Sequence, residues 1–178
     1  MKTITGYAVV WDAISTPLGG FIEVVRRGAF TNTLQAGDAR ALWNHNADFP
    51  LGRQSAGTLV VEEDTKGLRV TITPPDTSYA RDLIASIERR DVTGMSFGFT
   101  VTKDSWLRAG PSGFPVRQLL QVNLLEISPC TIPAYPQTEV HVRAVVAAME
   151  PAATVPPFTS PSLDLKRRRL RLIELTAA

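Results

Sequence analysis

Short segments rich in β-branched and aromatic residues follow one another along the chain, and they limit its fold more than any other feature. Such segments, bounded by Gly, Pro, Asp and Ser, are typical of β-strands. They are T-I-T-G-Y-A-V-V-W, G-F-I-E-V-V, A-R-A-L-W-N-H, G-T-L-V-V-E-E-D, G-L-R-V-T-I-T, V-T-G-M-S-F-G-F-T-V, V-R-Q-L-L-Q-V-N-L-L-E-I and T-E-V-H-V-R-A. The sequence D-T-K-G predicts a hairpin turn between the fourth and the fifth of them. Many strands with few helices predict a mainly β, α+β chain whose sheet is closed or sandwiched and largely antiparallel.

Two segments have helical spacing instead. In R-G-A-F-T-N-T-L-Q-A-G, Phe30 and Leu34 stand four residues apart and Gly37 ends the pattern. Residues 76–90 predict the clearest helix, and Asp76 is its expected N-cap. The apolar stripe of that helix consists of Tyr79, Ala80, Leu83, Ile84 and Ile87.

The composition changes near residue 150 and predicts three parts. We expect a folded domain over residues 1–148, a Pro-rich linker over 149–162 and a basic amphipathic tail over 163–178. From residue 163 onward five Lys and Arg residues oppose two Asp and Glu residues, whereas the whole chain has a net charge of +2. The domain itself is therefore close to neutral, and we expect no specific nucleic-acid partner.

The composition is ordinary for a globular protein, with 44% hydrophobic and 20% charged residues among 178. No apolar run approaches the roughly 20 residues that span a bilayer. The start, M-K-T-I-T-G-Y-A-V-V-W-D, lacks a signal-peptide core and resembles a first strand. We therefore expect a protein that is made and kept in the cytoplasm, is not secreted and has no membrane partner.

Residues 94–98 read G-M-S-F-G, which matches the G-x-S-x-G pattern of the α/β-hydrolase nucleophile elbow. An elbow needs a strand, a sharp turn and then a helix around its serine. Here the sequence after Ser96 continues as a strand, and the expected helix precedes it. The residues around Ser96 therefore predict a serine in the middle of a strand rather than at a nucleophile elbow.

Side chains alternate between the two faces of a strand. Met95, Phe97, Phe99 and Val101 would then form a core face. Gly94, Ser96 and Gly98 would share the other face, where the glycines leave open space for a substrate carbonyl. The alternative is that the two glycines mark bulges or close backbone packing and Ser96 only fills space.

A serine nucleophile needs a base, and only two histidines are present. His45 follows a strand and enters a loop, which favours it over His141, which alternates with Val140 and Val142 in a strand. Each histidine taken alone is also compatible with a structural role.

The base in turn needs an acceptor that fixes its tautomer. Glu126 shares its strand parity with Leu120, Val122 and Leu124, and a carboxylate on such an apolar face needs a partner. That partner would be His45 or an arginine such as Arg53. Asp48 and His141 are the alternatives to Glu126 for the third role.

Cys130 is the remaining candidate nucleophile. Its neighbours in I-S-P-C-T-I-P are apolar and none is basic, which predicts a buried, unreactive thiol. A single cysteine excludes a disulfide framework and a cysteine-rich zinc site. No phosphate-binding loop, dinucleotide fingerprint or metal-spaced histidine pair occurs, so we expect neither a cofactor nor a metal.

Five of these segments occur together in one order. They are the early strand, then R-R-G-A-F, L-W-N-H-N, the helix leading into V-T-G-M-S-F-G-F, and L-L-E-I-S-P-C-T-I-P-A-Y-P, and the region they define covers roughly residues 4–143. In this the chain resembles the prohead maturation serine proteases of tailed bacteriophages, which are related to the herpesvirus assemblins. The resemblance implies an antiparallel β-barrel core flanked by a few helices.

The resemblance also assigns roles by matching position. His45 is the histidine of the N-H segment, Ser96 the serine of G-M-S-F-G, and Glu126 the glutamate of L-E-I-S. Assemblins use a second histidine as their third residue, so His141 stays an alternative. The resemblance implies a serine endopeptidase that is packaged inside the immature capsid shell. There it would cleave the scaffold protein or the scaffolding segment of the major capsid protein, and also itself.

The basic tail could dock on the shell or scaffold, be removed by self-cleavage, or be a solvated tail, and a homo-oligomer is possible. Two other functions stay open at this point. One is a catalytically inactive capsid-assembly or scaffold protein of the same fold, in which Ser96, His45 and Glu126 would lie far apart. The other is an α/β-hydrolase esterase that uses Ser96, Glu126 and His141 and requires a helix directly after Ser96.

Overall fold

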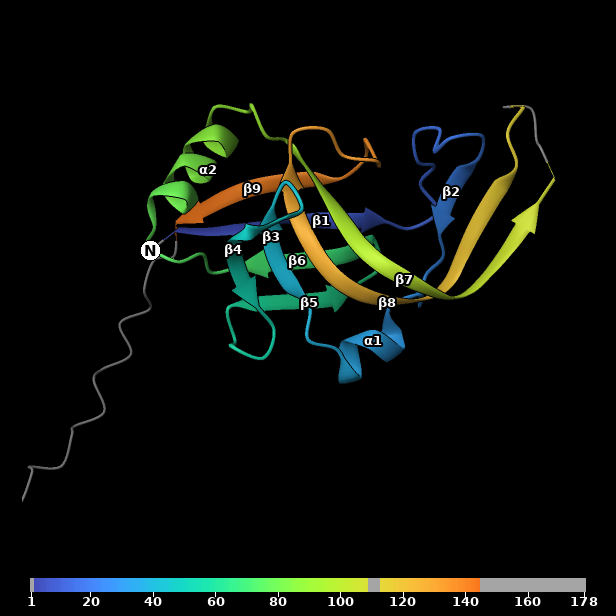
Figure 1. Cartoon of the computed structure of the whole chain (residues 1–178), viewed down its shortest axis with the longest axis horizontal. Coiled ribbons are helices and arrows are strands. Elements are labelled where there is room, and N and C mark those ends of the chain that lie inside the picture. The colour runs from blue at the N-terminus through green and yellow to red at the C-terminus, as the bar shows by residue number, and fades with distance from the viewer. Residues whose placement is uncertain (1, 109–112, 145–178) are drawn as a thin grey trace, which may run out of the picture. The chain divides into compact units, whose positions relative to one another are not determined.

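The computed structural model describes residues 2–108 and 113–144 of the chain (Figure 1). Within these ranges the chain forms nine strands and two helices. They are β1 (Lys2–Val10), β2 (Ile22–Val25), α1 (Thr31–Ala36), β3 (Arg40–Trp43), β4 (Asn46–Arg53), β5 (Leu59–Glu63), β6 (Gly67–Ile72), α2 (Ser78–Glu88), β7 (Gly94–Leu107), β8 (Val116–Cys130) and β9 (Glu139–Ala144). The mainly β, α+β prediction is confirmed. The predicted linker and tail, 149–162 and 163–178, lie outside the described residues.

The first sheet has the order β5-β6-β1-β9, and every neighbouring pair in it is antiparallel. The hairpin between β5 and β6 turns at D-T-K-G, as predicted. One oxygen of Asp64 accepts the backbone N–H groups of Lys66 (2.7 Å) and Gly67 (3.0 Å) there. This aspartate closes the turn by the side-chain-to-backbone bonding that makes Asp common in turns.

The second sheet is built around the long strand β8 and has the order β2-β8-β3-β4, with β7 also paired to β8. β7 runs antiparallel to β8 over almost its whole length, whereas β2 and β3 run parallel to β8. The sheet is thus mixed rather than antiparallel throughout. β4 was expected as a loop, because only one of its eight residues, Leu51, is buried, so its sequence lacks a continuous alternation.

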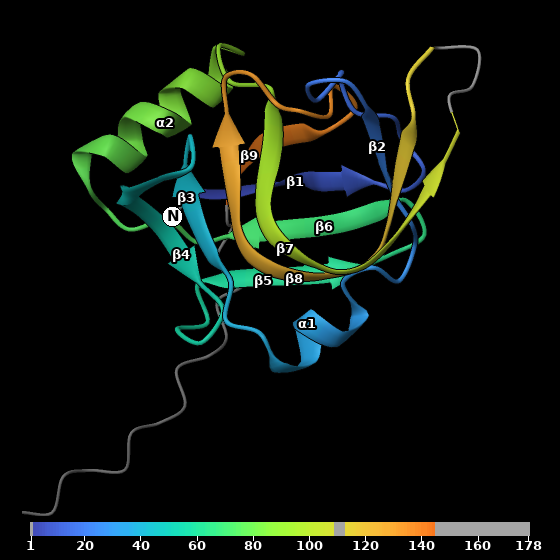
Figure 2. The same cartoon turned by 45° about the vertical axis from the view of Figure 1, so that its right-hand side comes forward.

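The apolar sides of the two sheets form one core. Figures 1 and 2 show β7 and β8 crossing in front of β1 and β6, and Met95, Phe97 and Ile127 lie buried among Ile4 and Leu68 in the core cluster. Met95 and Phe97 occupy the predicted core face of β7. Burial of each such side chain contributes on the order of 1.5–3 kcal/mol to stability.

Helix α2 covers one end of the core with the predicted stripe. Ala80, Leu83 and Ile87 are buried, while Tyr79 and Ile84 pack partly exposed against the core. The expected cap is wrong, because Thr77 occupies the N-cap position and makes no capping hydrogen bond. Asp76 precedes that position and pairs instead with Arg81, five residues further on, at 2.5 Å.

The closed barrel implied by the resemblance is not confirmed. The ladders of the described strands form two separate sheets. No helix in the described part of the chain is both long and apolar enough to span a bilayer.

Candidate active site

His45 stands at the tip of the hairpin that joins β3 to β4. Trp43 pairs with Asn46, so Asn44 and His45 form a two-residue turn with φ values of 52° and 59°. Positive φ at both central residues matches the type I′ turn that suits hairpins, where Asn is favoured first and Gly second. A histidine in the second position is strained, and such strain persists only where the surroundings hold the residue in place.

The end of β8 holds this turn in place. The N–H of Asn44 donates to the carbonyl oxygen of Pro129 at 3.1 Å, and the N–H of His45 donates to Ser128 Oγ at 3.1 Å. The N–H of Thr131 donates to Asn44 Oδ1 at 3.1 Å. Three bonds from one neighbouring segment therefore fix the backbone that carries the imidazole.

A β-bulge decides where Glu126 points. Glu126 lies opposite Gly98 and Leu124 lies opposite Phe99, so Leu125 is an extra residue on β8. The extra residue reverses the alternation of side chains along β8. Glu126 therefore points away from the core face of Leu124 and to the same face of the sheet as Ser96. The expectation that Glu126 lies on the apolar face is therefore wrong. The bulge also leaves the Leu125 side chain half exposed to solvent.

Glu126 does make the predicted contact with His45. His45 Nδ1 lies 2.6 Å from Glu126 Oε1, and Ser128 Oγ lies 2.5 Å from Glu126 Oε2. Because Ser128 Oγ already accepts the N–H of His45, its own proton points to the carboxylate. With Glu126 as the acceptor of both bonds, the ring proton of neutral His45 lies on Nδ1 and Nε2 is left as the basic atom.

The accessibility of the two side chains differs. The His45 side chain is 46% exposed, whereas the Glu126 side chain is 14% exposed beneath it. An exposed imidazole that rests on a shielded carboxylate can exchange protons with a bound substrate while its orientation is kept.

Ser96 lies on β7 directly opposite Ser128. Directly opposed residues of an antiparallel pair point to the same face, with Cβ atoms about 4.5–5.5 Å apart. Ser96 therefore neighbours the Ser128 hydroxyl that contacts both His45 and Glu126. Ser96 is 8% exposed, and among the described residues no hydrogen bond joins its hydroxyl to His45. Such bonds are often long in unliganded enzymes.

The glycines that flank Ser96 do not provide open space. A Cβ at Gly98 would lie 2.6 Å from Glu126 Oε1, and a Cβ at Gly94 would lie 2.7 Å from the ring of Pro133. The expectation of clearance for a substrate carbonyl is wrong, and close packing is the reason for both glycines. At Gly98 this packing is part of the candidate site, because the missing side chain makes room for the Glu126 carboxylate.

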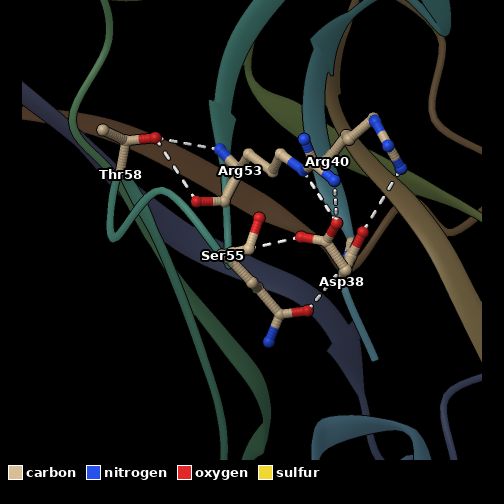
Figure 3. A network of polar contacts seen from close by, with 7 residues as sticks. Asp38, Arg40, Arg53, Ser55 and Thr58 are labelled. Carbon is tan, nitrogen blue, oxygen red and sulfur yellow. Dashed lines mark hydrogen bonds and ion pairs between the residues drawn. The ribbon is translucent and has the colours of Figure 1, made fainter. Parts of the chain in front are cut away.

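The alternative partner of Glu126 is engaged elsewhere. Arg53 Nε donates to Asp38 Oδ2 at 2.7 Å, and Figure 3 shows the Arg53 and Arg40 side chains converging on Asp38. The Arg53 guanidinium and the N–H of Ser55 hold the pKa of the Asp38 carboxyl far below its usual range. Asp48, the alternative third residue, lies exposed on β4, where its backbone N–H donates to Asn46 Oδ1 at 2.9 Å.

His141 lies in the other sheet. It pairs with Thr5 of β1, and its largely exposed ring lies 3.7 Å from Glu139. β7 continues unbroken as a strand from Gly94 to Leu107, so no helix follows Ser96. The α/β-hydrolase esterase is therefore wrong, and the elbow pattern has no elbow geometry.

Cys130 is buried at the end of β8, as expected. Burial, and secondarily the charge of Glu126, raises the pKa of its thiol to about 11. Because the thiolate is the reactive form, this environment disfavours Cys130 as a nucleophile.

Two polar residues of the site were missed from the sequence. Asn44 anchors the turn, and Ser128 contacts both His45 and Glu126. A signal for Ser128 was present, because it stands two residues after Glu126 and so shares its face of the strand. Asn before the histidine was also a signal, since Asn favours the first position of a type I′ turn.

A serine, a histidine with a basic ring nitrogen and a shielded carboxylate on neighbouring strands are the residue set of serine hydrolases. The site therefore has the residues of a serine hydrolase.

The chain belongs to the caudovirus prohead serine protease family, whose sequence model matches residues 1–152. The Prohead protease of Enterobacteria phage HK97 is 32% identical over 167 residues, which cover 91% of this chain and 69% of that protein. The family that the sequence resembles is thus confirmed, and the chain is a serine endopeptidase of phage capsid maturation.

Two solved structures of the Kaposi's sarcoma herpesvirus protease are also similar. The complex with a hexapeptide phosphonate inhibitor has a TM-score of 0.49 at 14% identity and covers 80% of this chain and 65% of its own. The complex with an allosteric inhibitor has a TM-score of 0.47 at 13% identity and covers 98% and 91%.

Proposed function

We propose that Ser96 is the nucleophile of this endopeptidase, His45 its general base and acid, and Glu126 the residue that orients His45. The observation that carries the proposal is the 2.6 Å contact between His45 Nδ1 and Glu126 Oε1, beside the strand position of Ser96. This contact leaves Nε2 to accept the serine proton.

The reaction proceeds through an acyl-enzyme. Ser96 Oγ bonds to the scissile carbonyl carbon while its proton passes to His45 Nε2. The carbon–nitrogen bond then breaks, and Nε2 returns the proton to the leaving amine. Water attacks the resulting ester and gives a proton to Nε2, which passes to Ser96 Oγ as the carboxylic acid leaves. Glu126 stabilises the imidazolium that forms in each half.

The substrates are proposed from the family. The proteolysis would take place inside the immature capsid shell, on the scaffold protein or the scaffolding segment of the major capsid protein, and on the protease itself. The family description and the name of the phage HK97 relative, Prohead protease, support this setting.

The test is co-expression of the chain with the major capsid protein of the same phage, followed by mass spectrometry of the products. We expect Ser96→Ala to abolish processing and Ser105→Ala, a serine at the far end of β7, to process as the wild type does. In parallel, an alkyl fluorophosphonate probe should modify the peptide that contains Ser96 and fail to modify the Ser96→Ala variant.

Processing by Ser96→Ala at the wild-type rate would overturn the assignment. If the wild-type protein cleaves the capsid protein but Ser96 does not react with the probe, a residue other than Ser96 is the nucleophile.

A further inference from the structure

We infer that Ser128 is a positioning residue of this active site, one that holds both the carboxylate of Glu126 and the backbone of His45. The inference rests on the proposed function of Ser96, His45 and Glu126. It assigns a role to the β8 residue that faces the nucleophile.

The Ser128 hydroxyl is fully committed to the site. It donates to Glu126 Oε2 at 2.5 Å and accepts the N–H of His45 at 3.1 Å. Ser128 is completely buried, so water does not reach the residue to replace either bond. A buried hydroxyl whose two bonds both go to proposed active-site residues does more than fill space between strands.

The bond to the His45 N–H addresses a specific difficulty of this backbone. His45 occupies the second position of a tight turn at φ 59°, a region that non-glycine residues rarely adopt. Asn44 is anchored to Pro129 and Thr131, but the direct anchor of the His45 backbone is Ser128 Oγ. Without it, His45 itself would keep only its ring contact with Glu126, while the anchors of Asn44 would remain.

The bond to Glu126 acts on the charge of the site. A carboxylate that accepts two bonds has its negative charge stabilised at both oxygens. An ionised Glu126 keeps the ring proton on Nδ1 and leaves Nε2 basic. Removing the Ser128 donor concentrates the negative charge on the oxygen that faces His45, so the pH dependence of the site should change.

The experiment measures the second-order rate of Ser96 modification by an alkyl fluorophosphonate from pH 5 to 9, because it requires no known cleavage sequence. In this reaction Ser96 Oγ bonds to phosphorus, fluoride leaves, and the serine proton passes to His45. We expect Ser128→Ala to react about 10- to 100-fold more slowly at its optimum, the loss of one charge-assisted bond. The acid limb of its pH profile should move as well.

Two further variants separate chemistry from folding. Ser128→Thr keeps the hydroxyl, so it should keep the wild-type acid limb even if the added methyl group lowers thermal stability. Ser128→Cys has nearly the wild-type volume but only a weak donor. It should therefore show the slower rate and the shifted limb, and it replaces Ser128→Ala if that variant does not fold.

The matched control is Ser15→Ala. Ser15 is also buried, accepts the N–H of Glu23 at 2.8 Å and donates to the carbonyl oxygen of Thr16 at 2.8 Å. Its removal costs a similar pair of bonds outside the site, so the stability falls while the rate and the acid limb stay as in the wild type.

The inference is overturned if folded Ser128→Ala or Ser128→Cys reacts at the wild-type rate with an unmoved acid limb, or if Ser15→Ala shows the same shift. These outcomes differ from failure of the proposed function, in which Ser96→Ala itself would still be modified as the wild type is.

Discussion

The two ends of the β7–β8 strand pair each hold a shielded glutamate with a different set of partners. At one end Glu126 contacts His45 and Ser128. At the other end Glu23 of β2, whose side chain is 4% exposed, accepts a bond from Tyr135 Oη at 2.8 Å. Arg117 lies 3.6 Å from Glu23 and pairs with Asp104 at 2.8 Å.

The partners separate a catalytic arrangement from a structural one. Burial raises the pKa of Glu23, and the Tyr135 bond and the Arg117 charge only partly oppose it. Arginine stays charged throughout the physiological range, and burial followed by the charge of Glu23 raises the pKa of Tyr135 far above that range. Histidine, in contrast, changes its charge near neutral pH. Under the proposed function Glu126 supports proton transfer at His45, whereas Glu23 ties β2, β8 and the segment of Tyr135 together.

The largest effect should come from neutralising each glutamate in turn. We expect Glu126→Gln to reduce the rate of fluorophosphonate modification about 10³- to 10⁴-fold, because an amide can hold the wrong tautomer of His45. Glu23→Gln should leave this rate within about twofold and affect only the free energy of unfolding, because the partners of Glu23 are Tyr135 and Arg117. Rates and urea unfolding curves of both variants measure the two effects.

The comparison fails if Glu23→Gln slows the reaction as much as Glu126→Gln does while remaining folded. It also fails if Glu126→Gln reacts at the wild-type rate.

A smaller effect on the reaction rate is expected from a substitution at Gly98, because the missing side chain there makes room for the Glu126 carboxylate. In Gly98→Ala the new Cβ would lie 2.6 Å from Glu126 Oε1, so the carboxylate must move away from His45. Because that carboxylate is the end of a flexible side chain, we expect little loss of thermal stability but a reaction about 10- to 100-fold slower. Ser105→Ala, on the part of β7 near the Glu23 end, is the control and should react normally. A normal rate in Gly98→Ala would show that the position of the carboxylate does not limit the reaction.

The smallest expected effect is a pH dependence of the free energy of unfolding that comes from Glu23. The pKa of Glu23 is raised in the folded protein above its ordinary value of 4.5. The protonated form is thus favoured by folding, and its stabilising contribution is fully present below pH 4.5 and is lost as the pH rises through the raised pKa. Relative to Glu23→Gln, the wild type should lose stability between pH 4.5 and neutrality.

Urea unfolding of the wild type and Glu23→Gln at several pH values measures this difference, in which the contributions of other groups largely cancel. Asp104, Arg117 and Tyr135 face Glu23 and are unchanged in both proteins. A stability difference that is independent of pH would contradict the assignment.

Much of the fold follows from local sequence. The strands other than β4, the D-T-K-G turn, both helices and the core face of Met95 and Phe97 were predicted, because alternation and helical spacing depend on residues that are close together in the chain. β4 was missed because it is an exposed strand whose only buried residue is Leu51. The parallel pairing of β2 and β3 with β8 joins segments distant in sequence, which no local pattern specifies.

The candidate site, too, was predicted in part from the sequence and decided in part by long-range contacts. His45, Ser96 and Glu126 were chosen from residue chemistry and resemblance, and the contact between His45 and Glu126 is observed. The reason given for Glu126 was wrong, because the bulge at Leu125 places it on the opposite face from the one that strict alternation predicts. The reason given for Gly98 was wrong as well, because its space is filled by Glu126.

The sequence by itself determined the strand-rich fold, the family and the residue types available for catalysis, since composition, spacing and motif order are properties of the chain. Only the tertiary structure decided that the bulge turns Glu126 toward Ser96, that a strained turn presents His45, and that Ser128 connects the two. The physical reason is that strand pairing creates the bulge and the contacts that anchor the turn. The residues brought together in this way are distant in sequence, since His45 lies more than 80 residues from both Glu126 and Ser128.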